Sequence, residues 1–357
     1  MLPQVSLTLG PRRRAALVVA GWAACALWTG VAGGQSVQPP APKENAAAAD
    51  CRTFRVRQQD EIWAVSTRCL GCPSGDLAQP RWSVWRYNAQ LPSWENASAA
   101  EFYATDLPDV TTAAYLHGNQ IGQNLSLADG LEVYFQLAGK LDDAPPVRFV
   151  IWSWPSDKIR GPLRDVRSKA CRTDSEAYYL ARFLAGMDPR VSAGLIGYSY
   201  GARIVAGGLH LLGGGNLAGQ AVAAAARPNL RVAFWVAAEH DDWLLPGRYH
   251  GQALPVADRW FITNNVCDPV LRRYRFVEKC SNPVALGYSG LVGRNLLSEE
   301  QNRRIEEMNV VHLVDDSHEM PRYLYSTPII ERTREIVLWP QHVPAAAGQE
   351  LAAATGK

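Results

Sequence analysis

The strongest chemical signal in the sequence is the run GYSYG at residues 197–201. In a G-x-S-x-G turn between a strand and a helix, small flanking residues permit the sharp bend that exposes the serine hydroxyl. The apolar residues 191–197 predict the strand, and residues 200–212 predict the helix. The positive end of that helix would favour negative charge that develops beside Ser199. We therefore predict Ser199 as a nucleophile; the alternative is a tight turn in which the serine only caps the helix.

A serine nucleophile needs a base that accepts its proton, and the base needs a carboxylate that orients it. His318 lies in the loop between the last predicted strand and the last predicted helix, where the chain order serine, acid, histidine places the base. His210 lies too far along the elbow helix, His312 falls within a predicted strand, and His342 begins the tail. We predict His318 as the base; the alternative is a solvated loop histidine.

Two positions in the sequence are candidates for the carboxylate that orients the base. Asp268 follows the predicted strand 259–263 and is our choice for the acid, because the acid usually follows the penultimate core strand. Since Pro269 comes next, Asp268 is also a natural cap for a short helix. Asp241 and Asp242 follow the preceding strand and are the reserve choice; their alternative role is to shape a loop near the pocket.

An acyl-transfer intermediate needs two backbone N–H groups that bind its negative oxygen. We expect one from Tyr200, directly after the nucleophile, and the other from Asn119, at the end of an earlier strand. Gly118 allows the backbone to approach a substrate closely. We interpret His117 as a residue that orients this loop rather than as a second base.

These residues need a scaffold, and the sequence predicts one. Apolar strands alternate with helices over residues 106–342, which predicts an α/β domain with a mostly parallel sheet and helices on both faces. The expected strands are 113–117, 147–154, 191–197, 230–238, 259–263 and 310–314. The expected helices are 126–140, 173–187, 200–212 and 323–337. Residues 51–105 are expected to form an N-terminal β extension, with strands at 53–57, 62–67 and 82–87.

The two ends of the chain differ from this domain. Residues 1–34 combine three arginines, the apolar run 15–32 and a small-residue exit, which predicts a signal peptide cut near Gly34 and hence an exported, periplasmic or extracellular protein. The alternatives are retention of residues 15–32 as a membrane anchor, or lipidation at Cys25. Residues 35–50 and 343–357 are rich in small and polar residues and predict a flexible linker and a disordered tail.

Export would give the cysteines an oxidising environment. Six of the seven remain after the signal: Cys51, Cys69, Cys72, Cys171, Cys267 and Cys280. We expect them to be structural, with disulfides allowed but the pairing left open. The motif CLGC at 69–72 lacks the second ligand pair of a zinc site and the context of a redox site. A bond from Cys267 to Cys280 would restrain the turn at Asp268 and is our hypothesis for that pair.

Charge and motifs exclude other classes of function. With 36 Lys+Arg against 34 Asp+Glu, the chain lacks the basic excess of most nucleic-acid-binding proteins. No phosphate-binding G-x-x-x-x-G-K-[ST] run and no H-E-x-x-H run occurs, and Gly213–Gly215 follows a helix rather than a strand. We therefore predict neither a cofactor nor a metal.

Taken together, these motifs resemble the α/β-hydrolase superfamily, and most closely a secreted bacterial branch with no assigned substrate. The likeness spans about residues 60–338 and is carried by HGN at 117–119, WSWPSD at 152–157 and GYSYGAR at 197–203, with VSTRC at 65–69 and LHLLGGG at 209–215. The resemblance implies an α/β-hydrolase fold at 106–342, the triad order and hydrolase chemistry. The long stretch from Asp268 to His318 departs from the pattern, and we interpret it as an insertion over the site.

The expected function is therefore that of a secreted serine hydrolase whose partner is a small-molecule ester or other acyl substrate. Esters are favoured because their leaving group needs the least activation, while an amidase or peptidase stays open. A non-catalytic secreted binding module on the same fold is the alternative, since a fold does not fix a function. Contact with a membrane is expected only if the signal is retained or lipidated.

Overall fold

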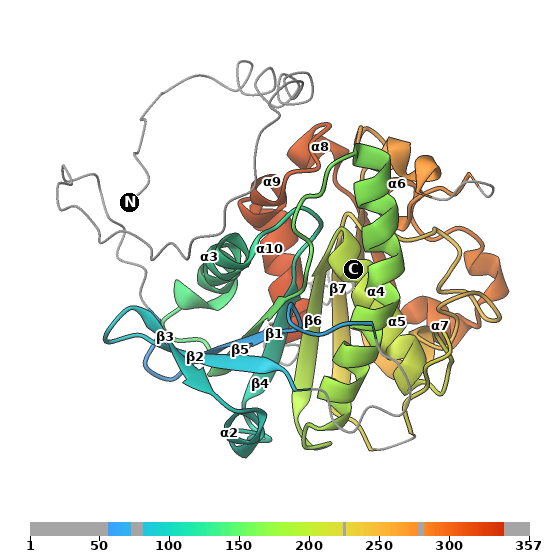
Figure 1. Cartoon of the computed structure of the whole chain (residues 1–357). Helices are drawn as coiled ribbons and strands as arrows, with labels where there is room; N and C mark the ends of the chain where they lie inside the picture. The colour runs from blue at the N-terminus through green and yellow to red at the C-terminus, as the bar shows by residue number, and fades with distance from the viewer. Residues whose placement is uncertain (1–55, 73–80, 224–225, 278–281, 339–357) are drawn as a thin grey trace, which may run out of the picture. The chain divides into compact units, whose positions relative to one another are not determined.

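The computed structural model describes residues 56–72, 81–223, 226–277 and 282–338 (Figure 1). The predicted signal peptide, the linker 35–50 and the tail 343–357 lie outside these residues. Within the described part, no helix combines the length and the apolar character that crossing a bilayer requires.

The described residues form a nine-stranded sheet in the order β3-β2-β1-β5-β4-β6-β7-β8-β9 (Figure 1). Strand β2 is antiparallel to β1 and β3, and all other neighbouring strands are parallel. The strands are β1 (Glu61–Ser66), β2 (Ser83–Asn88), β3 (Ser93–Ala97), β4 (Thr111–Leu116), β5 (Val147–Ser153), β6 (Ser192–Tyr198), β7 (Asn229–Trp235), β8 (Ala257–Asn264) and β9 (Ile305–Asn309). The predicted α/β class with a mostly parallel sheet is confirmed.

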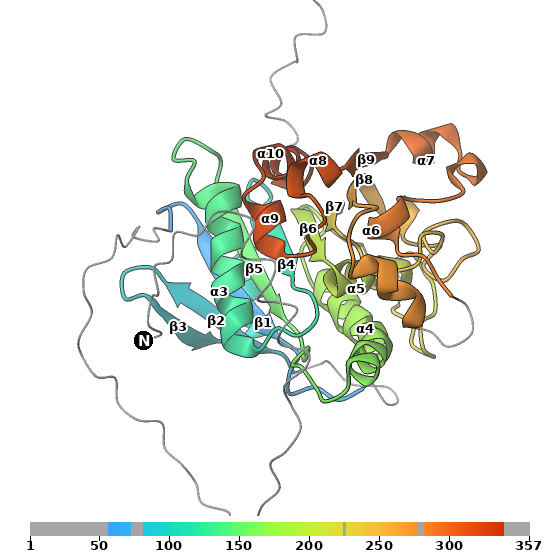
Figure 2. The same cartoon turned by 90° about the horizontal axis from the view of Figure 1, so that it is seen from above.

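Helices cover both faces of the sheet (Figure 2): α4 and α5 lie on one face, and α3 and α10 on the other. The α-helices are α2 (Ala99–Ala104), α3 (Gln123–Tyr134), α4 (Pro162–Ala185), α5 (Tyr200–Leu212), α6 (Leu286–Ser289), α7 (Glu299–Arg303), α8 (Val311–Val314), α9 (Met320–Leu324) and α10 (Thr327–Thr333). Shorter turns of 3₁₀ or π type are η2 (Phe135–Gly139), η3 (Leu254–Val256), η4 (Leu271–Phe276), η5 (Arg294–Leu296) and η6 (Arg334–Leu338).

The central strands are apolar along their whole length because both of their faces are covered. Every residue of β5 is buried, and in β6 only the first residue is partly exposed. Continuous apolar runs of this kind are typical of parallel strands between two helix layers. Strand β2 is mostly half-buried and β3 is mostly exposed, which fits their place at the antiparallel edge.

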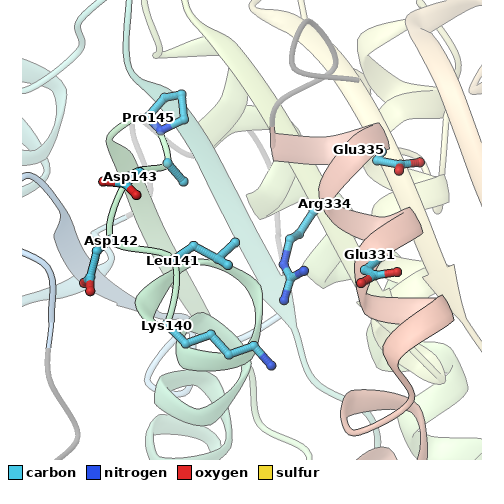
Figure 3. Close-up of a pocket in the computed structure, with 9 residues that line it drawn as sticks. Lys140, Leu141, Asp142, Asp143, Pro145, Glu331, Arg334 and Glu335 are labelled. Atoms are coloured by element: carbon cyan, nitrogen blue, oxygen red, sulfur yellow. The ribbon is translucent and has the colours of Figure 1, made fainter. Parts of the chain in front are cut away.

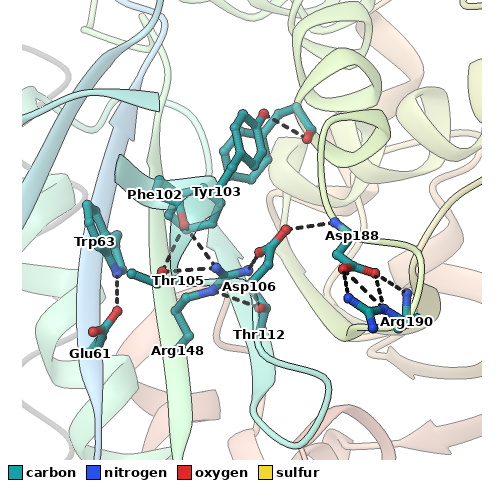
Figure 4. Close-up of polar contacts among 11 residues, drawn as sticks. Glu61, Trp63, Phe102, Tyr103, Thr105, Asp106, Thr112, Arg148, Asp188 and Arg190 are labelled. Carbon is teal, nitrogen blue, oxygen red and sulfur yellow. Dashed lines mark hydrogen bonds and ion pairs between the residues drawn. The ribbon is translucent and has the colours of Figure 1, made fainter. Parts of the chain in front are cut away.

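A buried arginine fastens helix α2 to the sheet (Figure 4). Arg148 of β5 pairs with Asp106, donates to Thr112 Oγ1 at 3.0 Å and lies over the ring of Phe102. Asp106 also accepts a hydrogen bond from the backbone of Asp188 at 2.7 Å. Because both charges are buried and paired, this cluster connects α2 to the amino end of the parallel sheet.

The predicted strand 310–314 is wrong. The last strand is β9, and residues 311–314 form the one-turn helix α8, so His312 lies on a helix and not in a strand. Only Ile305 of β9 is buried, because β9 is an edge strand. Its polar sequence therefore gives little strand signal, whereas the apolar run after it resembles a buried strand.

Other boundaries also differ from the predictions. Helix α4 begins at Pro162 rather than at residue 173, since proline is favoured in the first turn of a helix and its fixed φ suits that position. The expected helix 323–337 is divided into α9, α10 and η6, with Pro328 in the first turn of α10. Strand β3 and helix α2 were not predicted, and the described part of the expected strand 53–57, residues 56 and 57, is not in a strand.

Candidate active site

Ser199, His318 and Asp268 form one hydrogen-bonded chain. Nε2 of His318 lies 3.2 Å from Ser199 Oγ, and Nδ1 of His318 lies 2.6 Å from Asp268 Oδ2. Ser199 directly follows β6, Asp268 lies in the loop after β8, and His318 lies in the loop between α8 and α9, beyond β9. Because these strands are parallel, all three loops leave the same edge of the sheet. The structure thus brings together the three side chains predicted as nucleophile, base and acid.

The contacts of His318 fix which ring nitrogen carries its proton. An ionised aspartate only accepts hydrogen bonds, so the contact with Asp268 requires the proton of a neutral imidazole on Nδ1. The lone pair of Nε2 then faces the Ser199 hydroxyl, which is the orientation that proton removal needs. The Asp268 side chain is fully buried, whereas that of His318 is 15% exposed. A substrate can therefore approach the imidazole while the carboxylate stays shielded from water.

The backbone at Ser199 is strained and tightly packed. Its φ is +53° and its ψ is −117°, a conformation that side chains rarely adopt. The two flanking glycines are required, because a Cβ on Gly201 would lie 2.0 Å from the oxygen of Leu116 and a Cβ on Gly197 would lie 2.5 Å from Ala202 Cα. This is the sharp strand-to-helix turn that the GYSYG run predicts.

Neighbouring backbone holds the elbow in place from both sides. The Ser199 N–H donates to the oxygen of Trp235 at 3.0 Å, and the Ser199 carbonyl accepts from the N–H of Ala238 at 3.1 Å. Both partners belong to the chain at the end of β7, where Val236 also has a positive φ of 45°. A strained β-branched residue persists only when its surroundings determine its conformation, so the elbow and the end of β7 brace one another.

Asp268 performs two structural tasks at once. Its Oδ1 atom accepts hydrogen bonds from the backbone N–H groups of Val270, at 2.8 Å, and Leu271, at 3.0 Å. Its Oδ2 atom faces His318. The capping role and the role of triad acid were alternatives in the sequence, and the geometry combines them because each uses a different oxygen. Capping also orients the carboxylate toward the imidazole.

Asp241 and Asp242, the reserve choice for the acid, contact other residues than His318. Asp241 accepts a hydrogen bond from Ser289 Oγ at 3.0 Å, and burial raises the pKa of its carboxyl. Asp242 pairs with Arg248 at 3.4 Å. Among the residues that the structure describes, the carboxylate bonded to His318 is that of Asp268.

The loop after β4 passes directly over the nucleophile. A Cβ on Gly118 would lie 2.9 Å from the ring of Tyr198 and 3.2 Å from the Cβ of Ser199, so only glycine fits here without displacement. Asn119 is the next residue, and the N–H of Tyr200 stands in the first turn of α5, where N–H groups lack partners within the helix. Gly118 thus lies close to Ser199, and each of the two expected oxyanion donors belongs to the residue that follows one of them.

His117 is a fixed part of this loop. Its Nε2 accepts from the backbone N–H of Trp154 at 3.2 Å, so its Nδ1 carries the proton and donates to the oxygen of Gly118 at 2.9 Å. The ring also stacks on Trp154. Burial lowers the pKa of His117 to about 3, so the ring is neutral and holds the loop, as interpreted from the sequence.

Several residues near the site carry no sequence signal. Six non-glycine residues of the described chain have positive φ: Gln120, Ser199, Ala218, Val236, Asn282 and Asp315. Four of them belong to the elbow, the end of β7 or the loops that carry Asn119 and His318. Strain of this kind gathers at active sites. Glutamine and valine give no hint of such a conformation in a sequence, because they rarely adopt it.

A second buried polar cluster lies behind the elbow helix. His250 Nδ1 lies 3.0 Å from Glu239 Oε2, and both side chains are fully buried. Burial raises the pKa of Glu239 well above its usual range and lowers that of His250 well below it. Arg203 of α5 lies over the ring of Trp243 and contacts Tyr274 in the turn η4. The cluster thus packs α5 against the loops that follow β7 and β8.

The cysteines and metal ligands give no further site. The described cysteines Cys69, Cys72, Cys171 and Cys267 are free thiols, and Cys51 and Cys280 lie outside the described residues. The hypothesis of a Cys267–Cys280 bond therefore has one partner that the structure does not describe. Within the described ranges, no group of three or more His, Cys, Asp or Glu side chains is arranged to hold a metal ion.

An open groove of about 570 Å³ lies away from the triad (Figure 3). Its walls are residues 140–145, which precede β5, and Glu331, Arg334 and Glu335 of α10 and η6. Residues that precede a parallel strand lie at its amino end, whereas Ser199 follows the carboxyl end of β6. The groove therefore belongs to the opposite edge of the sheet.

No model of a known protein family matches the sequence. No curated protein matches it significantly either.

Proposed function

We propose that the chain is an exported serine hydrolase of the α/β-hydrolase type that cleaves carboxylic esters of small molecules. The observation that carries this proposal is the hydrogen-bonded chain from Asp268 through His318 to Ser199. The strained conformation of Ser199 at a strand-to-helix turn supports it further, since such a turn presents a nucleophile to substrate.

The first half of the reaction acylates the serine. Ser199 Oγ attacks the acyl carbonyl while its proton moves to Nε2 of His318, and Asp268 stabilises the resulting imidazolium. The carbonyl oxygen becomes an oxyanion that accepts hydrogen bonds from the N–H groups of Tyr200 and Asn119. When the tetrahedral intermediate collapses, the ester C–O bond breaks and the alcohol leaves with the proton from His318.

The second half releases the acid. A water molecule gives a proton to Nε2 of His318 and attacks the acyl carbon, and the same two N–H groups bind the second oxyanion. Collapse of this intermediate breaks the bond to Ser199 Oγ, and the proton returns from His318 to the serine. An ester is the favoured substrate, because its alcohol leaves with less activation than an amine does.

The sheet supports the assignment to the α/β-hydrolase type. The proposed nucleophile, acid and base follow in that chain order, each in a loop at or beyond the carboxyl end of a parallel strand. An antiparallel pair, β2 and β3, extends one edge of the parallel core. Fold alone does not imply catalysis, so the proposal rests on the site.

A fluorophosphonate probe tests the proposal directly, because it reacts with activated serines. The wild-type protein should be labelled and should hydrolyse p-nitrophenyl butyrate, and Ser199→Ala should lose both properties. Ser298→Ala is the matched control, since Ser298 is an exposed serine that only caps α7, and this variant should behave as wild type. Folded wild-type protein that is neither labelled nor active would contradict the proposal and favour a binding module.

The proposed export has its own test. N-terminal sequencing of the protein recovered from the cell envelope or the medium should begin near Gln35. Recovery of the chain with residues 15–32 intact in the membrane fraction would instead support an anchor.

A further inference from the structure

A buried carboxylate outside the triad contacts the loop that carries the proposed oxyanion donor. Asp165 lies in the first turn of α4 and is fully buried. Its Oδ2 atom accepts from Asn119 Nδ2 at 2.8 Å and from Gln120 Nε2 at 2.9 Å, and its Oδ1 atom accepts from the backbone N–H of Ile159 at 3.0 Å. One carboxylate thus joins three segments through three N–H groups.

We propose that Asp165 is a positioning residue that holds the N–H of Asn119 toward the oxyanion, through a latch made of Asp165, Asn119 and Gln120. This inference rests on the proposed function and deepens it. Hydrogen bonds to an ionised acceptor are about twice as strong as neutral ones. They can therefore offset the cost of the strained backbone at Gln120, whose φ is +62°.

The orientation of the Asn119 amide supports the latch. Its Oδ1 atom is buried and has no hydrogen-bond partner among the described residues. If the amide were turned over, this oxygen would face the carboxylate of Asp165, and two acceptors would repel one another. The bond to Asp165 therefore determines the orientation of the Asn119 amide.

Other contacts fix the two ends of this loop but not its middle. His117 is held by Trp154 at one end. At the other end, Ile121 donates to and accepts from Ser156 Oγ. Asn119 and Gln120 lie between these anchors, and both side chains reach Asp165. Removal of the carboxylate should therefore loosen the donor without unfolding the loop.

The test uses Asp165→Asn, which keeps the shape of the side chain but removes its charge and replaces one of its two acceptor oxygens with an NH₂ group, so that either the amides of Asn119 and Gln120 or the N–H of Ile159 lose their acceptor. We expect kcat for p-nitrophenyl butyrate to fall by about 10- to 100-fold, less than the loss of a whole oxyanion donor costs, with KM changed by less than about threefold. Asp106→Asn is the matched control: this buried carboxylate also ties a loop and pairs with Arg148, but at the amino end of the sheet. It should lower the melting temperature and leave kcat unchanged.

A reciprocal exchange separates positioning from general stability. In the double variant Asn119→Asp with Asp165→Asn, a carboxylate and an amide again face each other with donor and acceptor reversed, while Gln120 loses its acceptor, so part of the lost kcat should return. Hydrogen exchange provides a readout that does not depend on turnover: the amides of residues 118–121 should exchange faster in Asp165→Asn than in wild type.

These measurements distinguish failure of the latch from failure of the proposed function. Normal kcat in folded Asp165→Asn, unchanged exchange of residues 118–121, or no recovery in the double variant would overturn the latch while leaving the proposed function intact. A wild-type protein without esterase activity and without probe labelling would overturn the proposed function, and with it the catalytic meaning of the latch.

Discussion

The hydroxyl of Tyr198 donates a hydrogen bond to the backbone oxygen of His318 at 2.6 Å. The residue before the proposed nucleophile thus holds the backbone of the proposed base, although the two lie far apart in the sequence. Their rings are also in contact, with centroids 5.7 Å apart. The distance from His318 to Ser199 is therefore set from the elbow itself as well as by Asp268.

The first prediction concerns this hydrogen bond. Tyr198→Phe should lower kcat by about tenfold and the free energy of unfolding by about 1 kcal/mol, because a buried hydrogen bond is lost and the histidine backbone gains freedom. Kinetics and urea unfolding measure both quantities. Tyr103→Phe removes an equivalent bond to the oxygen of Phe183, at 3.0 Å and away from the site. Tyr103→Phe should lower the free energy of unfolding by a similar amount and leave kcat unchanged. An equal loss of kcat in both variants would refute the role of the Tyr198 hydrogen bond.

The second prediction separates the two oxygens of Asp268. Asp268→Asn keeps an acceptor for the N–H groups of Val270 and Leu271 but opposes the required tautomer of His318, so kcat should fall by about 10³- to 10⁴-fold with the fold retained. Asp268→Ala should lose a comparable amount of activity and also about 1 kcal/mol of stability, because the cap is removed.

Asp241→Asn is the control for this pair of variants, since Asp241 contacts Ser289 rather than His318. It should retain the activity of the wild type. If Asp241→Asn were inactive and Asp268→Asn active, the assignment of the acid would have to be exchanged.

The third prediction concerns the close approach of Gly118. Gly118→Ala would place a methyl group 2.9 Å from the ring of Tyr198, so the loop has to move away from Ser199. We expect kcat to fall by more than about tenfold, because a small displacement of an oxyanion donor is costly. Gly71→Ala is the control, since nothing lies within 4 Å of the added atom there. Steady-state kinetics of the two variants decide the point, and equal activity would show that the loop does not approach the substrate.

The fourth prediction is a pH dependence of stability. His117 has a pKa of about 3 in the folded protein and about 6.5 when unfolded. Between these values the unfolded chain binds a proton that the folded chain does not, so His117 weakens the fold as the pH falls through this window, by about 1.4 kcal/mol per unit.

Urea unfolding of wild type and His117→Gln at pH 7 and pH 5 isolates this contribution. The difference in the free energy of unfolding between the two proteins should shift by about 2 kcal/mol in favour of the glutamine variant at pH 5. The same difference at both pH values would mean that His117 titrates alike in the folded and unfolded chains.

The grouping of Ser199, Asp268 and His318 was predictable from the sequence because their chain order is restricted and because Ser199 and Asp268 follow strand ends, whereas the strand predicted before His318 is the helix α8. The sheet was predictable where strands are buried on both faces, as in β5 and β6. Sequence patterns failed where burial is one-sided or where a contact is long-range. Strand β9 is polar because it lies at the edge of the sheet. The prediction therefore assigned the last strand to the apolar residues that form α8.

The latch could not be predicted for a different reason. Asp165 resembles any acidic residue in the first turn of a helix, a position that the helix dipole favours. Its partners Asn119 and Gln120 reach it only because β4 and β5 lie side by side while α4 begins beside the loop after β4. The positive φ of Gln120 is likewise a product of the folded neighbourhood and not of the residue type.

The bracing of Ser199 by the end of β7 has a consequence for how such a protein can change. Because two hydrogen bonds hold the backbone of Ser199, this residue cannot shift to follow different molecules, so other parts of the chain have to bring each molecule to it. The segment beside Asp268 carries the exposed apolar residues Val266, Val270 and Phe276 and is suited to that delivery. Under the proposed function, replacing this segment should therefore alter which compounds are accepted while the backbone at Ser199 is preserved.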